Sequence, residues 1–121
     1  MMNAFLRPFY KILRPVYRKI QILFTKIHIR HRAKKSVVKI VVGASNLYDK
    51  GWIPTEIDFL NLLKESDWQS LFKRESIDAI LAEHVWEHLS LEEGAKAAKM
   101  CYLYLKPKGY LRVAVPDGYH F

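Results

Sequence analysis

The sequence predicts an α/β fold in which a partial parallel sheet is flanked by helices and preceded by a basic N-terminal helical arm. Three observations support this prediction. Short apolar, β-branched segments alternate with segments of helical periodicity, helix-capping signals punctuate the second part of the chain, and the charge changes abruptly near Ser36. Apolar strands that alternate with helices are typical of a parallel sheet that helices cover on both faces.

The first domain that we expect is a basic amphipathic arm, residues 1–35. It contains ten of the twenty Lys and Arg residues and none of the twelve acidic residues of the chain. Apolar residues recur in it at helical spacing, with basic residues between them: Val16, Ile20, Leu23 and Ile27. Because a proline inside a helix removes a backbone donor and costs about 3 kcal/mol, we expect this helix to begin at Pro15.

The second domain that we expect, residues 36–121, contains the sheet. Short runs of apolar and β-branched residues predict strands at residues 37–42, 52–57, 59–63, 77–82 and 110–115. Pro54 cannot donate a hydrogen bond to a neighbouring strand. It therefore favours an edge or a bulge for the second of these strands.

Two helices are expected between these strands, because each begins with a capping-box pattern. The first runs from Ser66 to about Phe72, and the second follows Ser90 and stops at residues 106–109, where Pro and Gly terminate it. We expect Met100 and Cys101 to be packing residues of the second helix. Its apolar residues at spacings of three and four are Leu91, Ala95, Ala98, Tyr102 and Leu105.

Composition limits the class of protein. Half of the residues are hydrophobic and 13% are aromatic, which excludes wholesale disorder. The single cysteine, Cys101, cannot form an intramolecular disulfide, and this fits a reducing compartment. The sequence has neither a run of apolar residues long enough for a membrane span nor a secretory leader pattern. We therefore expect a cytoplasmic protein that can also lie peripheral to a membrane.

The expected strands place one candidate binding site. Ligands of parallel sheets bind beyond the carboxyl ends of the strands. The segments in that position are residues 43–45, Glu56, residues 83–88 and residues 116–118. We expect them to lie along one rim of the sheet.

Three segments, in this order along the chain, are similar to those of a known family. Residues 77–89 (IDAILAEHVWEHL), residues 105–109 (LKPKG) and residues 111–118 (LRVAVPDG) resemble class I S-adenosylmethionine-dependent methyltransferases of the methyltransferase type 11 kind. Residues 37–57 resemble the first two strands of that family more loosely. The resemblance implies a Rossmann-like domain truncated after its fifth strand, S-adenosylmethionine as cofactor, and a methyl acceptor of unknown identity.

The resemblance also implies cofactor-binding residues. Gly43 matches the first glycine after the first strand, in a loop that keeps only this one of the family's glycines. Glu56 matches the acid that accepts hydrogen bonds from the two ribose hydroxyls, and Asp58 is its rival because the register of the strand is uncertain. The full implied set is Gly43, Ala44, Glu56, Asp58, Asn61 near the adenine, and Glu83 and His84 on the methionine side. We name no catalytic residue, because methyl transfer mainly requires alignment of the acceptor.

Other interpretations of these residues stay open. Gly43 can be a simple turn residue, and Glu56 and Asp58 can be solvated loop acids. The segment from His84 to His88 also spells an H-x-x-E-H zinc motif, which requires a helix and a further ligand. We favour the methyltransferase interpretation and expect no metal.

The arm supports a second class of function, a non-catalytic binding protein. Ten basic residues interleaved with apolar and aromatic ones suit an anionic membrane surface. They also suit the phosphates of nucleic acids, although the apolar stripe favours the membrane. In a third alternative the arm packs on the sheet.

A last strand at residues 110–115 would leave an apolar sheet edge, which predicts self-association.

Overall fold

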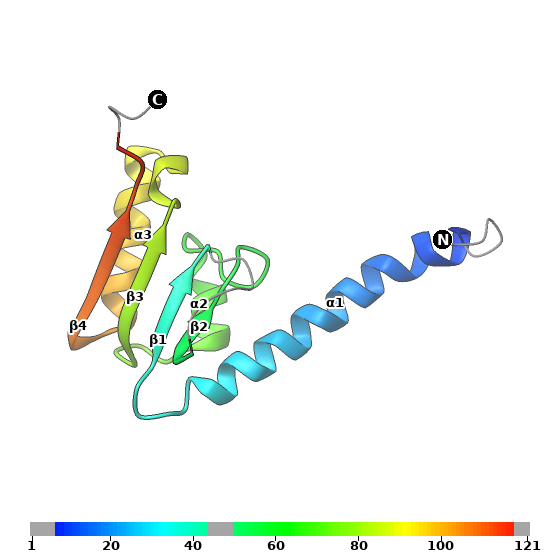
Figure 1. Cartoon of the computed structure of the whole chain (residues 1–121), viewed down its shortest axis with the longest axis horizontal. Coiled ribbons are helices and arrows are strands. Elements are labelled where there is room, and N and C mark those ends of the chain that lie inside the picture. Colours follow the sequence, from blue (N-terminus) through cyan, green and yellow to red (C-terminus); the bar gives the residue numbers. More distant parts are fainter. Residues whose placement is uncertain (1–6, 44–49, 118–121) are drawn as a thin grey trace.

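The computed structural model describes residues 7–43 and 50–117, and their architecture confirms the expected α/β class (Figure 1). Its centre is a parallel sheet of four strands in the order β2-β1-β3-β4. The strands are β1 (Lys39–Val42), β2 (Trp52–Pro54), β3 (Ile77–Glu83) and β4 (Leu105–Ala114), and the helices are α1 (Arg7–Arg32), α2 (Glu65–Leu71), η1 (Trp86–His88) and α3 (Leu91–Tyr104).

Helices α2 and α3 lie on the same face of the sheet (Figure 1). The indole of Trp68 on α2 stacks on the ring of Tyr104 on α3, with 5.0 Å between ring centroids. The strand order explains this arrangement. The chain crosses from β2 to β3 and from β3 to β4 in the same direction, and right-handed crossovers then place both helices on one side. The prediction that helices cover both faces of the sheet is therefore not confirmed within the described residues, where α2 and α3 cover one face.

The hydrophobic core lies between this face and the helices. Ile40, Ile80, Trp68 and Tyr104 are at most 1% exposed, and the indole N–H of Trp68 donates to the carbonyl of Leu62 at 3.1 Å. Burial of large apolar and aromatic side chains contributes most of the free energy that holds such a domain together. The strand expected at 77–82 is confirmed throughout, whereas those expected at 37–42 and 52–57 are confirmed in part, at residues 39–42 and 52–54. Strand β2 is an edge strand of the described sheet, as Pro54 indicates.

Helix α3 packs through a different stripe from the predicted one. Its capping box is confirmed, because Ser90 Oγ accepts from the backbone N–H of Glu93 while Glu93 Oε1 accepts from that of Ser90. However, Leu91 and Tyr102 are 93% and 78% exposed. The buried residues are instead Ala97, Met100, Cys101 and Tyr104, which confirms the packing role of Met100 and Cys101. Burial raises the pKa of the Cys101 thiol to about 12, so this thiol stays protonated and unreactive.

Three other local predictions are wrong. Residues 59–63 form turns rather than a strand, because the N–H groups of Phe59 and Leu60 both donate to the carbonyl of Glu56. Helix α2 begins at Glu65 without a side-chain cap, and the carboxylate of Asp67 accepts from the backbone N–H of Asn61 instead. Helix α3 ends at Tyr104, just before residues 106–109, so its predicted end is confirmed, but these residues belong to β4 rather than to a turn. They form an irregularity in its pairing with β3.

Strand β4 is paired on one side only, by β3, within the described residues. Its exposed residues include Tyr110 and Val113, at 55% and 41%. An exposed apolar edge favours pairing with another strand, which is why the sequence predicts self-association. Self-association itself stays a prediction.

Helix α1 is longer than expected. It begins at Arg7 and continues through Pro15, so the prediction of a helix start at Pro15 is wrong. A proline inside a helix removes one hydrogen bond, and here the helical turns on both sides of it persist. The N-terminal part of α1 projects away from the sheet (Figure 1). Within the described part of the chain, no helix is long and apolar enough to cross a membrane.

Asp78 joins the segment after α1 to the sheet. Its carboxylate accepts from the backbone N–H of Val38 at 2.7 Å and from Lys106 Nζ at 3.0 Å, and the same ammonium donates to the carbonyl of Ser36. The hydrogen bond from Val38, followed by the contact with Lys106, lowers the pKa of Asp78. The start of β1 is therefore fixed to both β3 and β4 by one charged group.

Candidate functional site

The strand order reverses at one point of the sheet. The chain leaves β1 for β2 on one side, whereas β3 lies on the other side of β1. In open parallel sheets, ligands bind beyond the carboxyl ends of the strands where the order reverses in this way. The residues that follow β1 and β3, Gly43 and His84, therefore lie at the expected rim.

Gly43 is required by its geometry. Its φ of +72° is in the left-handed region that favours glycine. A Cβ built at this position would lie 2.6 Å from Cγ2 of Val85 and 4.0 Å from the carbonyl oxygen of Glu83. The missing side chain thus lets the turn after β1 pack against the turn after β3. This geometry agrees with the turn interpretation of Gly43, and its predicted role toward a cofactor stays a prediction. Ala44 lies outside the described residues.

His84 has an unusual backbone conformation for a residue with a side chain. Its φ is 57°, and its N–H donates to the carbonyl of Ala114 at the end of β4 at 2.9 Å. Non-glycine residues in this region are uncommon and are often found at functional sites. The side chain is 70% exposed, with Nδ1 3.4 Å from a carboxylate oxygen of Glu87, and Glu83 is exposed beside it.

The zinc motif is not presented on a helix. The segment after His84 forms the short 3₁₀ helix η1, so His84 and His88 do not share an α-helical face. Across residues 7–43 and 50–117, no group of three His, Cys, Asp or Glu side chains is placed to hold a metal ion.

Thr55 fixes the segment after β2 to the end of β1. It is fully buried, and both its backbone N–H and its hydroxyl donate to the carbonyl of Val41, each at 2.8 Å. These two bonds place the next residue, Glu56, beside the carboxyl end of β1. The Glu56 side chain is 36% exposed, so its carboxylate is accessible to solvent.

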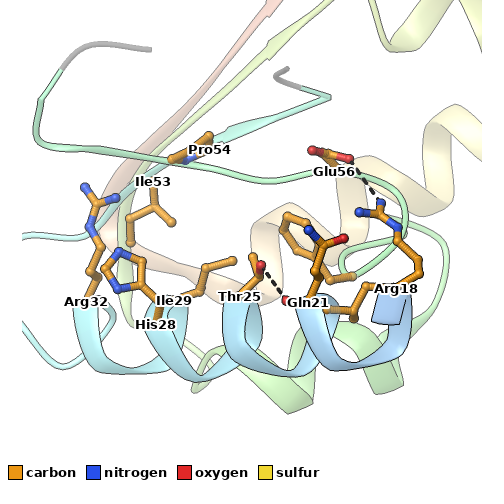
Figure 2. Close-up of a pocket in the computed structure, with 11 residues that line it drawn as sticks. Arg18, Gln21, Thr25, His28, Ile29, Arg32, Ile53, Pro54 and Glu56 are labelled. Atoms are coloured by element: carbon orange, nitrogen blue, oxygen red, sulfur yellow. Dashed lines mark hydrogen bonds and ion pairs between the residues drawn. The ribbon is translucent and has the colours of Figure 1, made fainter. Parts of the chain in front are cut away.

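Arg18 of the arm contacts both acids that the sequence singles out. One of its terminal nitrogens, Nη2, lies 3.9 Å from Oε2 of Glu56 and donates a hydrogen bond to Oδ2 of Asp58 (Figure 2 shows the pair with Glu56). Sequence reasoning missed this partner. A signal was present, because Ile22 and Ile29 lie outside the apolar stripe of the arm and share a helix face with Arg18.

The same face of α1 and the outer edge of β2 enclose a pocket of about 280 Å³ (Figure 2). Arg32 closes one end by donating to the carbonyl of Trp52 at 3.1 Å, and Arg18 with Glu56 closes the other. This pocket flanks β2, and its lining includes neither Gly43 nor His84 at the carboxyl ends of β1 and β3. Its lining residues are Arg18, Gln21, Ile22, Thr25, His28, Ile29, Arg32, Ile53, Pro54, Glu56 and Phe59.

Asn61 forms hydrogen bonds with residues close to it in the chain. Its side-chain oxygen accepts from the backbone N–H of Leu63 at 3.0 Å, and its own N–H donates to Asp67. This residue therefore shapes the loop between β2 and α2, which carries Glu56. The structure brings the candidate residues together in two groups, one formed by Gly43, Glu83 and Val85 and the other by Glu56, Asp58 and Arg18.

Comparison with known proteins gives one match. The model of a family described as "Methyltransferase domain" matches residues 30–113, from the last turn of α1 to β4. Searches of curated proteins and of solved structures gave no match. The matched segment is more than half of the chain, and it includes the four parallel strands and the rim that carries Gly43, Glu56 and His84. The chain therefore belongs to the methyltransferase-domain family, type 11, with the Rossmann-like fold of class I S-adenosylmethionine-dependent methyltransferases.

Proposed function

We propose that this chain binds S-adenosylmethionine at the carboxyl rim of β1, β2 and β3 and transfers its methyl group to an acceptor. The observation that carries the proposal is the position of Glu56. Two hydrogen bonds from Thr55 to Val41 hold the backbone that leads into Glu56 beside the end of β1, within the segment that the methyltransferase family model matches. An acid after the second strand is the group that a ribose diol requires in Rossmann-like folds.

The residues present fit this cofactor. A carboxylate has two acceptor oxygens and can receive both ribose hydroxyls, and the Glu56 side chain is accessible. The negative charge of Glu83, exposed at the end of β3, complements the amino group and the sulfonium of the cofactor. Gly43 and Ala44 would approach it through their backbone, and Asn61 would lie toward the adenine. Asp58 is the second candidate for the ribose, because it lies two residues after Glu56 and contacts the same arginine, Arg18.

The bound cofactor would supply a methyl group on a positively charged sulfur, which is already a good electrophile. The chain's own residues would then act by position. Glu56 would orient the ribose, and the segment from Glu83 to Val85, held to β4 by the bond from His84 to Ala114, would limit how the methionine end lies. Alignment of this kind is the main contribution that a protein makes to a transfer reaction with a good leaving group.

Calorimetric titration with S-adenosylmethionine and S-adenosylhomocysteine tests the proposal. We expect the intact chain to bind both compounds and Glu56→Ala to weaken binding by about tenfold or more, because hydrogen bonds to a charged group contribute about 1.5–3 kcal/mol each. A matched control is Glu65→Ala. Glu65, at the start of α2, has a similar exposed fraction, 35%, and likewise pairs with an arginine, Arg74.

Binding that survives in Glu56→Ala, with or without Asp58→Ala, would contradict the assignment of the ribose acid. A folded chain that binds neither compound would contradict the proposed function itself. Circular dichroism on each variant separates loss of binding from loss of the fold.

A further inference from the structure

Helix α1 has two apolar faces, and within residues 7–43 and 50–117 only one of them packs against other elements. Ile29 is 2% exposed and Ile22 is partly buried, on the face that meets β2 and α2. The other face is open to solvent. Its residues, with exposed fractions of 44–66%, are Leu13, Val16, Tyr17, Ile20, Leu23, Phe24 and Ile27, which we call the outer stripe.

The outer stripe is continuous. At about 100° per residue, its seven members fall within a single arc of about 120°, and the centre of this arc lies opposite Ile22 and Ile29. From Leu13 to Ile27 the stripe extends for about 20 Å along the helix. Isolated apolar residues on a surface need no explanation, whereas a contiguous patch of this size indicates an interaction site.

Basic residues border the outer stripe. Lys19, Lys26 and Arg30 follow one of its sides along the helix, and the first 35 residues of the chain contain ten Lys and Arg residues and no acid. Lysine and arginine at the border of an apolar stripe can hold their charges at the level of lipid headgroups while their stems cover apolar surface. This combination of stripe and borders is the signature of a helix that lies in the plane of a membrane interface.

We propose that the outer stripe of α1 docks the protein onto an anionic lipid bilayer. Charge complementarity selects this occupant. A second copy of α1 would bring two acid-free, strongly basic helices together, which like-charge repulsion opposes. Nucleic acid would be bound by the basic residues but would leave the seven apolar residues in water. An anionic bilayer would accommodate both the apolar and the basic residues, with the outer stripe among the acyl chains and the basic residues beside it among the headgroups.

Docking in this orientation preserves the fold. The outer stripe points away from the face of α1 that carries Arg18, Ile22 and Ile29, so the contacts with β2 and with Glu56 stay in place. The sheet and its carboxyl rim would remain on the aqueous side of the helix. The proposal does not depend on the methyltransferase activity and has a separate readout.

Co-sedimentation of the full chain with vesicles tests the proposal. We expect binding to vesicles that contain phosphatidylserine, weak binding to vesicles of phosphatidylcholine alone, and loss of binding at high salt. The double variant Ile20→Gln, Phe24→Gln should lower the partition coefficient by about tenfold or more, because both side chains then lose their transfer into the acyl region. Lys19→Gln, Lys26→Gln should lower it by about tenfold on anionic vesicles only.

Matched controls come from the other domain. Ile57 is 72% exposed and Lys96 and Lys99 are exposed on α3, so Ile57→Gln and Lys96→Gln, Lys99→Gln change the same chemistry outside the arm and should leave binding unchanged. Absence of binding to anionic vesicles at low salt would overturn the proposal. So would an Ile20→Gln, Phe24→Gln variant that binds normally, or one that instead converts an oligomer into a monomer in light scattering without lipid. A duplex oligonucleotide that competes with the vesicles and binds this variant as tightly as the intact chain would also overturn it.

Discussion

The arm and the sheet domain use similar apolar residues in opposite ways. In the 26-residue helix α1, Phe24 is 66% exposed and only Ile29 among the described apolar side chains is fully buried. The seven-residue helix α2 buries both Trp68 and Leu71. A helix in a folded protein is stabilised mainly by the apolar face that it packs, so length alone says little about its contribution. The longest helix of this chain therefore contributes less to the folded domain than one of the shortest.

The strongest test of this difference is to truncate one aromatic residue in each of the two regions. Trp68→Ala removes a fully buried indole, its stacking on Tyr104 and its bond to Leu62, and should lower the free energy of unfolding by about 3–5 kcal/mol. Phe24→Ala should change it by less than about 0.5 kcal/mol, since surface substitutions rarely do more. Urea denaturation monitored by circular dichroism measures both. Equal losses would mean that the outer stripe is packed in solution, which would also contradict its role in docking.

A smaller effect is expected at the junction of the two regions. Asp78→Asn keeps the shape of the side chain but removes the charge that holds Val38 and Lys106, and should lower the free energy of unfolding by about 1–2 kcal/mol at neutral pH. The pKa of Asp78 is lowered in the folded chain, so its contribution is complete above the ordinary value of 3.8 and is lost as the pH falls through the folded value.

The difference in unfolding free energy between the intact chain and Asp78→Asn should therefore shrink below pH 3.8. A difference that stays constant across that range would mean that the carboxylate charge does not contribute. Lys106→Met is the companion variant. It removes the second partner and leaves the bond from Val38.

The sequence predicted the sheet well because strands β1 and β3 are encoded by local, β-branched apolar runs. The cap at Ser90 was predictable for the same reason, since both of its partners lie within four residues. The stripe of α3 was not, because two interleaved sets of apolar residues both have helical spacing. The set that is buried includes Tyr104, which stacks on Trp68, a residue distant in the chain, and such a contact cannot be read from local spacing.

The sequence predicts where the candidate residues lie along the fold, but not which side chains they contact. The position of Glu56 follows from the strand pattern and the family resemblance. Its proximity to Arg18 does not, because helical spacing marks a second face of the arm but does not identify the distant segment that this face contacts. Gly43 shows the same limit: its spacing predicted a turn at the rim, whereas the side chain that occupies the space beside it, Val85, depends on how β1 and β3 pair.

The smallest effect that we predict connects the two regions. In the proposed function, Arg18 would compete with the cofactor for the carboxylate of Glu56, and it would add positive charge beside a ligand that is itself a cation. Arg18→Ala should therefore raise the affinity for S-adenosylmethionine. The exposed fractions of Arg18 and Glu56 are 50% and 36%, and exposed pairs of this kind contribute at most about 1 kcal/mol, so the gain should be about two- to fivefold. Calorimetric titration measures it, with Arg74→Ala as the control, since Arg74 follows α2 and pairs with Glu65 at the start of that helix. Weaker binding in Arg18→Ala would mean that the arginine positions Glu56 for the ribose instead of competing for it.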